Sequence, residues 1–263
     1  MDLELAGKVA IIGGASKGLG RACADVLAQE GAKLTLCSRT AADLHEAAEE
    51  IRSETNAEIL EYPGDLDDPK TITALVAATV EKFGRLDVMV NNSGGPPLAR
   101  AATATEEQWA TAVQRSLLFF VRMSQESLPH LRKQGAGRII NILASTVKQP
   151  IDNLALSGAT RMGVVAYAKS LADEVGRDGV TVNNVCPGSI LSDRMLSNVT
   201  SRANELGISV EEALAERAKE TAVGRVGDPA ELAHLVAFLA SSKATYITGT
   251  TTMVDGGLVR SVL

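Results

Sequence analysis

Short apolar runs alternate along the chain with longer stretches in which apolar residues recur at helical spacing. The short runs predict seven strands, at residues 9–13, 33–37, 58–62, 86–91, 138–143, 180–185 and 251–254. The longer stretches predict six helices, at residues 19–30, 41–54, 70–83, 106–133, 154–176 and 230–241. Strands that alternate with helices, joined by right-handed crossovers, predict an α/β fold: a doubly wound, seven-stranded parallel sheet with helices on both faces.

No linker or low-complexity stretch divides the chain, so its 263 residues predict a single domain, 1–263. Residues 188–226 fit the alternation less well, because they are polar and follow the sixth strand as two probable helical pieces. Ligands of such sheets bind beyond the carboxyl ends of the strands. This insert is therefore in a position to cover the site as a mobile lid. The other interpretation is a surface segment without a role at the site.

Composition narrows the function classes. A net charge of -6, with no run of Lys and Arg, argues against a nucleic-acid surface. No apolar run approaches the ~18 residues that span a membrane, and the start lacks a signal-peptide form, so we expect a cytoplasmic protein. The three cysteines, Cys23, Cys37 and Cys186, are predicted to be buried, reduced thiols. The three histidines are scattered on predicted helices, at His45, His130 and His234, so no metal site is predicted.

A glycine-rich loop joins the first strand to the first helix. Gly14, Gly18 and Gly20 allow a tight turn there and let backbone N–H groups approach a pyrophosphate at the helix N-terminus. The strand before it and the helix after it are the context that a dinucleotide site requires. Contacts with the cofactor are also predicted for the residues between the glycines, Ser16, Lys17 and Leu19.

The end of the second strand indicates which dinucleotide binds. An NAD enzyme normally carries an acidic residue there, which binds the ribose 2′-hydroxyl. This chain has Ser38 followed by Arg39, and Lys17 lies in the glycine loop. Two cations without a carboxylate suit the 2′-phosphate of NADP(H), which is the predicted cofactor.

Further motifs follow in a fixed order. Asp65-Leu66 comes after the third strand, Asn91-Asn92-Ser93-Gly94 after the fourth, and Pro187-Gly188, with Ile190 and Ser192, after the sixth. Together with TGTTTMVDGG near the C-terminus, they make almost the whole chain similar to the short-chain dehydrogenase/reductase family, in particular to its 3-oxoacyl-carrier-protein reductase-like members. The resemblance implies a Rossmann fold and a homotetramer. It also implies cofactor contacts at these motifs, namely at Asp65, Leu66, Asn91, Ser93, Gly94, Pro187, Gly188, Ile190 and Ser192.

Three of the four catalytic residues of that family are replaced in this chain. The family places a Ser after the fifth strand and Tyr-x-x-x-Lys on the next helix, with an Asn on the helix before. This chain keeps the first of these as Ser145. Ser157 stands in the tyrosine position and Arg161 in the lysine position, while the asparagine position falls on Ser116.

These substitutions exclude a direct copy of the family mechanism. A serine side chain falls roughly 4 Å short of a tyrosine hydroxyl, as standard bond lengths show, and it is a far weaker acid than a phenol with its pKa of about 10. Arg161 can hold a ribose or an oxyanion, but it does not exchange its proton near neutral pH. Halohydrin dehalogenases also carry an arginine here, yet they retain the tyrosine and lack the glycine loop, so dehalogenation is not expected.

Three accounts of the chemistry stay open. Lys148, in the loop after Ser145, is the best-placed candidate for a relocated proton donor, and an exposed loop lysine is the alternative interpretation. In the second account Ser145, Ser157 and Arg161 stabilise an oxyanion while water supplies the proton. Under both of these accounts the predicted function is an NADP(H)-dependent oxidoreductase that acts on a small carbonyl or alcohol substrate with a non-standard proton donor. In the third account the protein binds NADP(H) without turnover, as a sensor or assembly partner.

Overall fold

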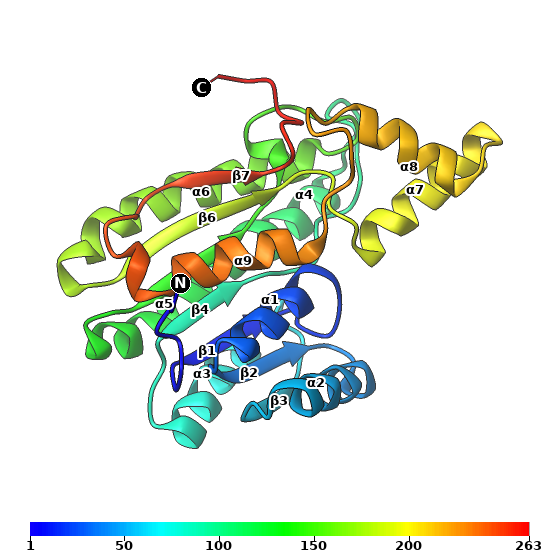
Figure 1. Cartoon of the computed structure of the whole chain (residues 1–263). Helices are drawn as coiled ribbons and strands as arrows, with labels where there is room; N and C mark the ends of the chain where they lie inside the picture. Colours follow the sequence, from blue (N-terminus) through cyan, green and yellow to red (C-terminus); the bar gives the residue numbers. More distant parts are fainter. Residues whose placement is uncertain (263) are drawn as a thin grey trace.

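The computed structural model describes residues 1–262 and contains the predicted seven-stranded sheet (Figure 1). The strand order is β3-β2-β1-β4-β5-β6-β7, and every neighbouring pair is parallel. The strands are β1 (Val9–Gly13), β2 (Lys33–Ser38), β3 (Ile59–Pro63), β4 (Val88–Asn91), β5 (Arg138–Ile142), β6 (Thr181–Pro187) and β7 (Thr251–Val254). The order reverses between β1 and β4, which is where such sheets bind ligands.

Helices cover both faces of the sheet (Figure 1). One face carries α1 (Gly18–Gln29), α2 (Ala41–Thr55) and α9 (Pro229–Ala240). The other carries α3 (Pro69–Phe83), α5 (Phe119–Gln134) and α6 (Ala155–Val175), with α4 (Glu106–Val113) ahead of α5. No helix among residues 1–262 is both long and apolar enough to cross a membrane.

Successive side chains of a strand point to opposite faces of the sheet, so each strand contributes to two hydrophobic cores. Ala10 and Ile12 of β1 pack toward α1 and α9, whereas Val9 and Ile11 pack toward α3 and α5. Because the chain has few aromatic residues, both cores consist mainly of Ala, Val, Leu and Ile. The three cysteines are buried and free, as predicted. Burial raises the pKa of both Cys37 and Cys186 to about 12.

Asparagine side chains cross the sheet interior as a hydrogen-bonded row. Asn91 Nδ2 donates to Asn141 Oδ1 at 2.8 Å, and Asn141 Nδ2 donates to Asn184 Oδ1 at 2.9 Å. Asn184 Nδ2 in turn donates to Thr251 Oγ1 at 3.0 Å. We call Asn91, Asn141, Asn184 and Thr251 the amide row. It ties β4, β5, β6 and β7 together near the end of the sheet where the site lies.

The helix predicted over residues 106–133 is wrong as a single α-helix. A π-helical turn, η1 (Gln114–Leu118), separates α4 from α5. Its wider i→i+5 turn accommodates one extra residue, so the apolar pattern of α5 is offset from that of α4. Ser116 lies inside this turn, fully buried, and its Oγ has no hydrogen-bond partner among the described residues. The other predicted helices and the strands agree with the structure to within two residues.

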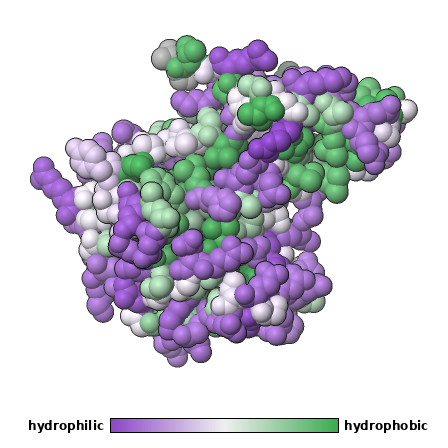
Figure 2. All heavy atoms as spheres, in the orientation of Figure 1, coloured by the Kyte–Doolittle hydropathy of each residue, from purple (hydrophilic) through white to green (hydrophobic). Residues whose placement is uncertain are grey.

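The insert after β6 forms two helices, α7 (Asp193–Leu206) and α8 (Val210–Lys219), in agreement with its two predicted pieces. They project from the body of the domain as a hairpin (Figure 1). The hairpin leaves and rejoins the domain at one point, where Ile190 and Gly227 form a β-bridge. Apolar side chains gather on its surface (Figure 2), among them the exposed Leu196 and Leu206.

Candidate active site

The glycine loop turns sharply between β1 and α1. Gly14 and Gly18 have φ of 59° and 60°, a region that favours glycine. A Cβ at Gly20 would lie 2.2 Å from the carbonyl oxygen of Gly14, so the loop closes on itself only without a side chain there. No side chain caps α1 at Lys17. The N–H groups at this helix start therefore remain for an anion, and the loop fits a dinucleotide pyrophosphate.

Asn92 holds the glycine loop in place, a role that the sequence patterns did not indicate. Its Nδ2 donates to the carbonyl oxygen of Gly13 at 3.0 Å and reaches that of Gly14 at 3.5 Å. The only local signal was its position in the Asn91-Asn92-Ser93-Gly94 motif. Asn91 itself directs its side chain into the amide row, so that side chain lies inside the sheet and away from the glycine loop.

The cations predicted for the 2′-phosphate differ in their surroundings. Arg39 is exposed directly after β2 and has no hydrogen-bond or ion-pair partner within residues 1–262. Lys17 Nζ, in contrast, lies 3.3 Å from Asp43 Oδ2. Ser38 is buried, and its hydroxyl donates to the carbonyl oxygen of Thr40 at 3.4 Å. Arg39 is therefore the cation that is available to a phosphate without breaking an existing pair.

Other predicted cofactor residues surround the same edge of the sheet. Leu66 packs against Gly13, whereas Asp65 is exposed and accepts from its neighbour Asp67 N at 3.0 Å. Ser93 donates to the carbonyl oxygen of Arg115 at 3.3 Å. Gly94 follows it with open space on its Cα, since nothing lies within 4 Å of a Cβ built there.

The segment after β6 lies next to the glycine loop. Gly188 N donates to the carbonyl oxygen of Val254 at 3.0 Å, next to Pro187. Ile190 is buried at the base of the hairpin. Ser192 accepts from Met195 N at 3.3 Å as the N-cap of α7, and its Cβ lies 3.6 Å from a Cβ built at Gly18. The hairpin thus begins beside the proposed cofactor loop.

Three residues of the predicted catalytic set gather at the carboxyl end of β5. Ser145 opens a short 3-10 helix, η2 (Ser145–Val147), directly after that strand. Ser157 and Arg161 lie one turn apart on α6, and all three residues are about 5% exposed. Ser157 Oγ lies 3.4 Å from Thr146 Oγ1. Ser145 and Ser157 therefore line the same sheltered corner.

Arg161 is anchored to the main chain and has spare donors. Its Nη1 donates to the carbonyl oxygens of Leu143 and, at 3.4 Å, of Ile142. Its Nε is buried and has no hydrogen-bond partner in the part of the chain that the structure describes. Burial, with a smaller contribution from the charge of Arg194, lowers the pKa of Arg161 to about 10. The group consequently stays charged at neutral pH and can stabilise an oxyanion there.

None of the three tyrosines lies next to Ser157. Tyr167 lies ten residues beyond Ser157 on α6, about 15 Å along the helix axis. Tyr62 is on β3, at the far edge of the sheet from β5, and Tyr246 is fully exposed. Lys148 directly follows η2, and its side chain is exposed with no partner within residues 1–262. Its charge is one of those that influence Cys186 on β6, which places it near the same strand ends.

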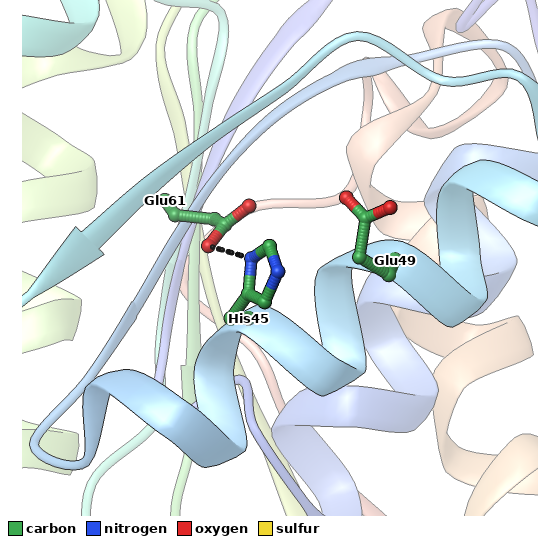
Figure 3. Close-up of side chains that lie close together, drawn as sticks. All are labelled: His45, Glu49 and Glu61. Atoms are coloured by element: carbon green, nitrogen blue, oxygen red, sulfur yellow. Dashed lines mark hydrogen bonds and ion pairs between the residues drawn. The ribbon is translucent and has the colours of Figure 1, made fainter.

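A cluster of potential metal ligands lies elsewhere, between α2 and the edge strand β3 (Figure 3). His45 Nδ1 is 3.1 Å from Glu61 Oε2, and Glu49 lies one turn along the helix from His45. The guanidinium of Arg52 already donates to both carboxylates. These charges therefore compensate one another as an ion-pair network, and nothing at this cluster connects it with the site at the strand ends.

Comparison with known proteins agrees with this geometry. Residues 14–259 match the family model described as enoyl-(acyl carrier protein) reductase. The chain is 36% identical to the 3-oxoacyl-[acyl-carrier-protein] reductase FabG of Vibrio cholerae, over 97% of this chain and 99% of the relative. The crystal structure of L-sorbose reductase from Gluconobacter frateurii, complexed with NADPH and L-sorbose, superposes with a TM-score of 0.96 at 32% identity, covering 100% of both chains.

A second structure, an actinorhodin polyketide ketoreductase variant with NADPH, superposes with a TM-score of 0.91 at 33% identity, over 97% of this chain and 98% of the other. These matches extend from the glycine loop to the last strand and include the segment that carries Ser145, Ser157 and Arg161. The protein is an oxidoreductase of the short-chain dehydrogenase/reductase family.

Proposed function

We propose that the protein is an NADP(H)-dependent oxidoreductase that interconverts a small carbonyl compound and its alcohol through an arginine-based oxyanion site. The observation that carries the proposal is Arg161, a buried guanidinium that lies one helical turn from Ser157 and whose Nε has no acceptor among the described residues. Preorganised donors of this kind stabilise charge that develops on an oxygen atom in a sheltered site.

Cofactor binding rests on the first half of the chain. When bound, NADPH supplies the hydride that the carbonyl carbon needs. The glycine loop and the uncapped start of α1 would hold the pyrophosphate, and the unpaired Arg39 would hold the 2′-phosphate. The NADPH complexes of the sorbose reductase and the polyketide ketoreductase support this preference.

Residues in the second half of the chain would stabilise the charge that develops on the substrate oxygen atom and would supply its proton. As the carbon accepts a hydride, the π electrons of the carbonyl group move to the oxygen, which becomes an alkoxide. Arg161 and Ser145 donate hydrogen bonds to that alkoxide, and the space left by the short Ser157 side chain admits a water molecule that delivers the proton. The exposed Lys148 is the other group at this edge that carries a transferable proton.

Two further features belong to this proposal. The α7–α8 hairpin covers the bound substrate, supported by its start beside Gly18 and its exposed apolar side chains. The protein assembles as a homotetramer, a proposal that rests on its membership of the family. Sedimentation velocity tests the assembly, and a monomer at micromolar concentration would refute it.

A panel of carbonyl substrates with NADPH tests the function itself. Wild type, Ser157→Ala and Lys148→Ala are compared by the rate of NADPH oxidation, and NADPH affinity is measured by fluorescence. We expect turnover that survives in Lys148→Ala, because water delivers the proton. Loss of at least a hundredfold in that variant would instead make Lys148 the donor. Tight NADPH binding without turnover of any substrate would favour the silent binding protein.

A further inference from the structure

Two arginines at the strand ends lack an acidic partner. Arg161 binds only main-chain carbonyl oxygens, and Arg194, in the first turn of α7, reaches only the carbonyl oxygen of Pro96 at 3.5 Å. Neither forms an ion pair within residues 1–262, whereas nearby Arg115 is paired with Asp67 at 2.7 Å. Arg161 is buried whereas Arg194 is exposed, so Arg161 is the cation whose charge stays uncompensated inside the protein.

Three neighbouring segments bring these cations to one edge. Arg161 is tied to the end of β5, and Arg194 begins the hairpin that follows β6. The Arg194 guanidinium rests against Gly95, which follows β4, since a Cβ built at Gly95 would lie 2.4 Å from Arg194 Nη1. Burial, and to a smaller extent the charge of Arg194, also lowers the pKa of Arg161.

The pair has unused hydrogen-bonding capacity as well as charge. The Nε of Arg161 is buried and has no acceptor among the described residues. A buried donor without an acceptor is costly, and two like charges repel. Both costs fall when an anion with several oxygen atoms lies between the guanidinium groups, because their planar forks match carboxylate and phosphate oxygens.

We propose that Arg161 and Arg194 bind a carboxylate or phosphate group of the substrate, so that the enzyme acts on a carbonyl compound that carries an anion close to the carbonyl carbon. This inference rests on the proposed function. The cofactor phosphates have the same chemistry, but the glycine loop, the start of α1 and Arg39 already provide for them. Arg161 instead lies one turn from Ser157, at the reacting oxygen.

Binding to NADP⁺-loaded protein tests the inference, since an oxidised cofactor cannot reduce a ketone. Two matched pairs serve as probes in calorimetric titrations, acetoacetate with methyl acetoacetate and dihydroxyacetone phosphate with dihydroxyacetone. In at least one pair we expect the anion to bind about ten to a hundred times more tightly than the neutral compound, the usual range for a charged hydrogen bond. Arg194→Gln should abolish that difference.

Arg202→Gln is the matched control, because Arg202 lies on the same helix, is 62% exposed and pairs with Glu205. It should leave both affinities unchanged. Equal binding of the anionic and neutral compounds, or no binding in either pair, overturns the inference. So does Arg194→Gln if it weakens NADPH binding as much as anion binding, because the cations then serve the cofactor. If the enzyme reduces only neutral ketones, the proposed function stands and this inference is wrong. If anions bind but no substrate is turned over, this inference stands and the proposed function is wrong.

Discussion

Arg161 Nη1 donates a hydrogen bond to the main-chain carbonyl oxygen of Leu143, the residue that follows β5. This bond fixes one edge of the guanidinium to the sheet and leaves its Nε as a donor without an acceptor in residues 1–262. A lysine at the same position would present a single point charge on a flexible stem. Arg161 is therefore a planar cation that the main chain orients.

Replacement of Arg161 tests this orientation. Arg161→Ala should lower kcat/KM about 10²–10³-fold, which is typical of losing one oxyanion donor. Arg161→Lys keeps the charge but not the planar fork, so we expect a smaller loss. Steady-state kinetics with the best substrate of the panel measures both, and circular dichroism confirms folding. Full activity in a folded Arg161→Ala protein would remove Arg161 from the mechanism.

Gly20→Ala should prevent cofactor binding, because the new Cβ would lie 2.2 Å from the carbonyl oxygen of Gly14. Either the loop opens or α1 shifts, and both movements disrupt the pyrophosphate cradle. NADPH fluorescence titration measures the loss. Gly176→Ala is the control, since nothing lies within 4 Å of a Cβ built there. Normal NADPH affinity in Gly20→Ala would place the cofactor elsewhere.

Arg39→Gln should weaken NADPH binding about ten- to a hundredfold and leave NADH binding unchanged, because only NADPH carries the 2′-phosphate. Lys33→Gln is a control at the opposite end of the same strand, where Lys33 pairs with Glu58 at 2.7 Å. Dissociation constants of both cofactors for the three proteins decide the matter. If NADH binds more tightly than NADPH to the wild type, the cofactor assignment is wrong.

The amide row should stabilise the sheet. Asn141→Ala removes an acceptor from Asn91 and a donor from Asn184, and both partners remain buried. We expect a loss of about 2–4 kcal/mol in the free energy of unfolding, measured by urea denaturation. Asn198→Ala, on the exposed side of α7, should stay within about 0.5 kcal/mol. Equal stabilities for the two variants would contradict a structural role for the row.

The buried thiols should resist labelling. With a pKa of about 12, Cys37 and Cys186 carry a thiolate fraction on the order of 10⁻⁴ at pH 8. A thiol reagent should therefore react with three thiols only after denaturation. Between the ordinary pKa of 9.0 and about 12 the unfolded chain ionises first, so the contribution of these thiols to stability is lost as pH rises through that range. Rapid labelling of the native protein at pH 8 would show that a cysteine is accessible.

Local pattern predicted the fold better than it predicted the site. The apolar runs located every strand, because a strand buried on both faces must be apolar throughout, as β1 is. The π-turn at Ser116 was missed, since one extra residue changes hydrogen-bond register without changing composition. The resemblance to the family, rather than local pattern, selected Ser145, Ser157 and Arg161, which the structure brings to one corner.

Contacts between distant segments escaped prediction. Asn91 and Asn92 are adjacent, yet one side chain joins Asn141 in the sheet and the other supports Gly13. Nothing in the dipeptide distinguishes them, because their partners are about 50 and 79 residues away. Arg194 was missed for the same reason, since its neighbours Gly95 and Pro96 belong to another loop.

The two ends of the hairpin are hydrogen-bonded to each other. Leu191 N donates to the carbonyl oxygen of Gly227 at 2.9 Å, and Gly227 N donates to that of Ser189 at 2.8 Å. The sheet therefore sets no length for the chain between these stems, and closing a longer or shorter loop changes its entropy only slowly. A change in the length of residues 192–220 would therefore leave the register of the seven strands unchanged, whereas Val223 stays tied to the turn after β7, where its N–H donates to the carbonyl oxygen of Gly256 at 3.1 Å.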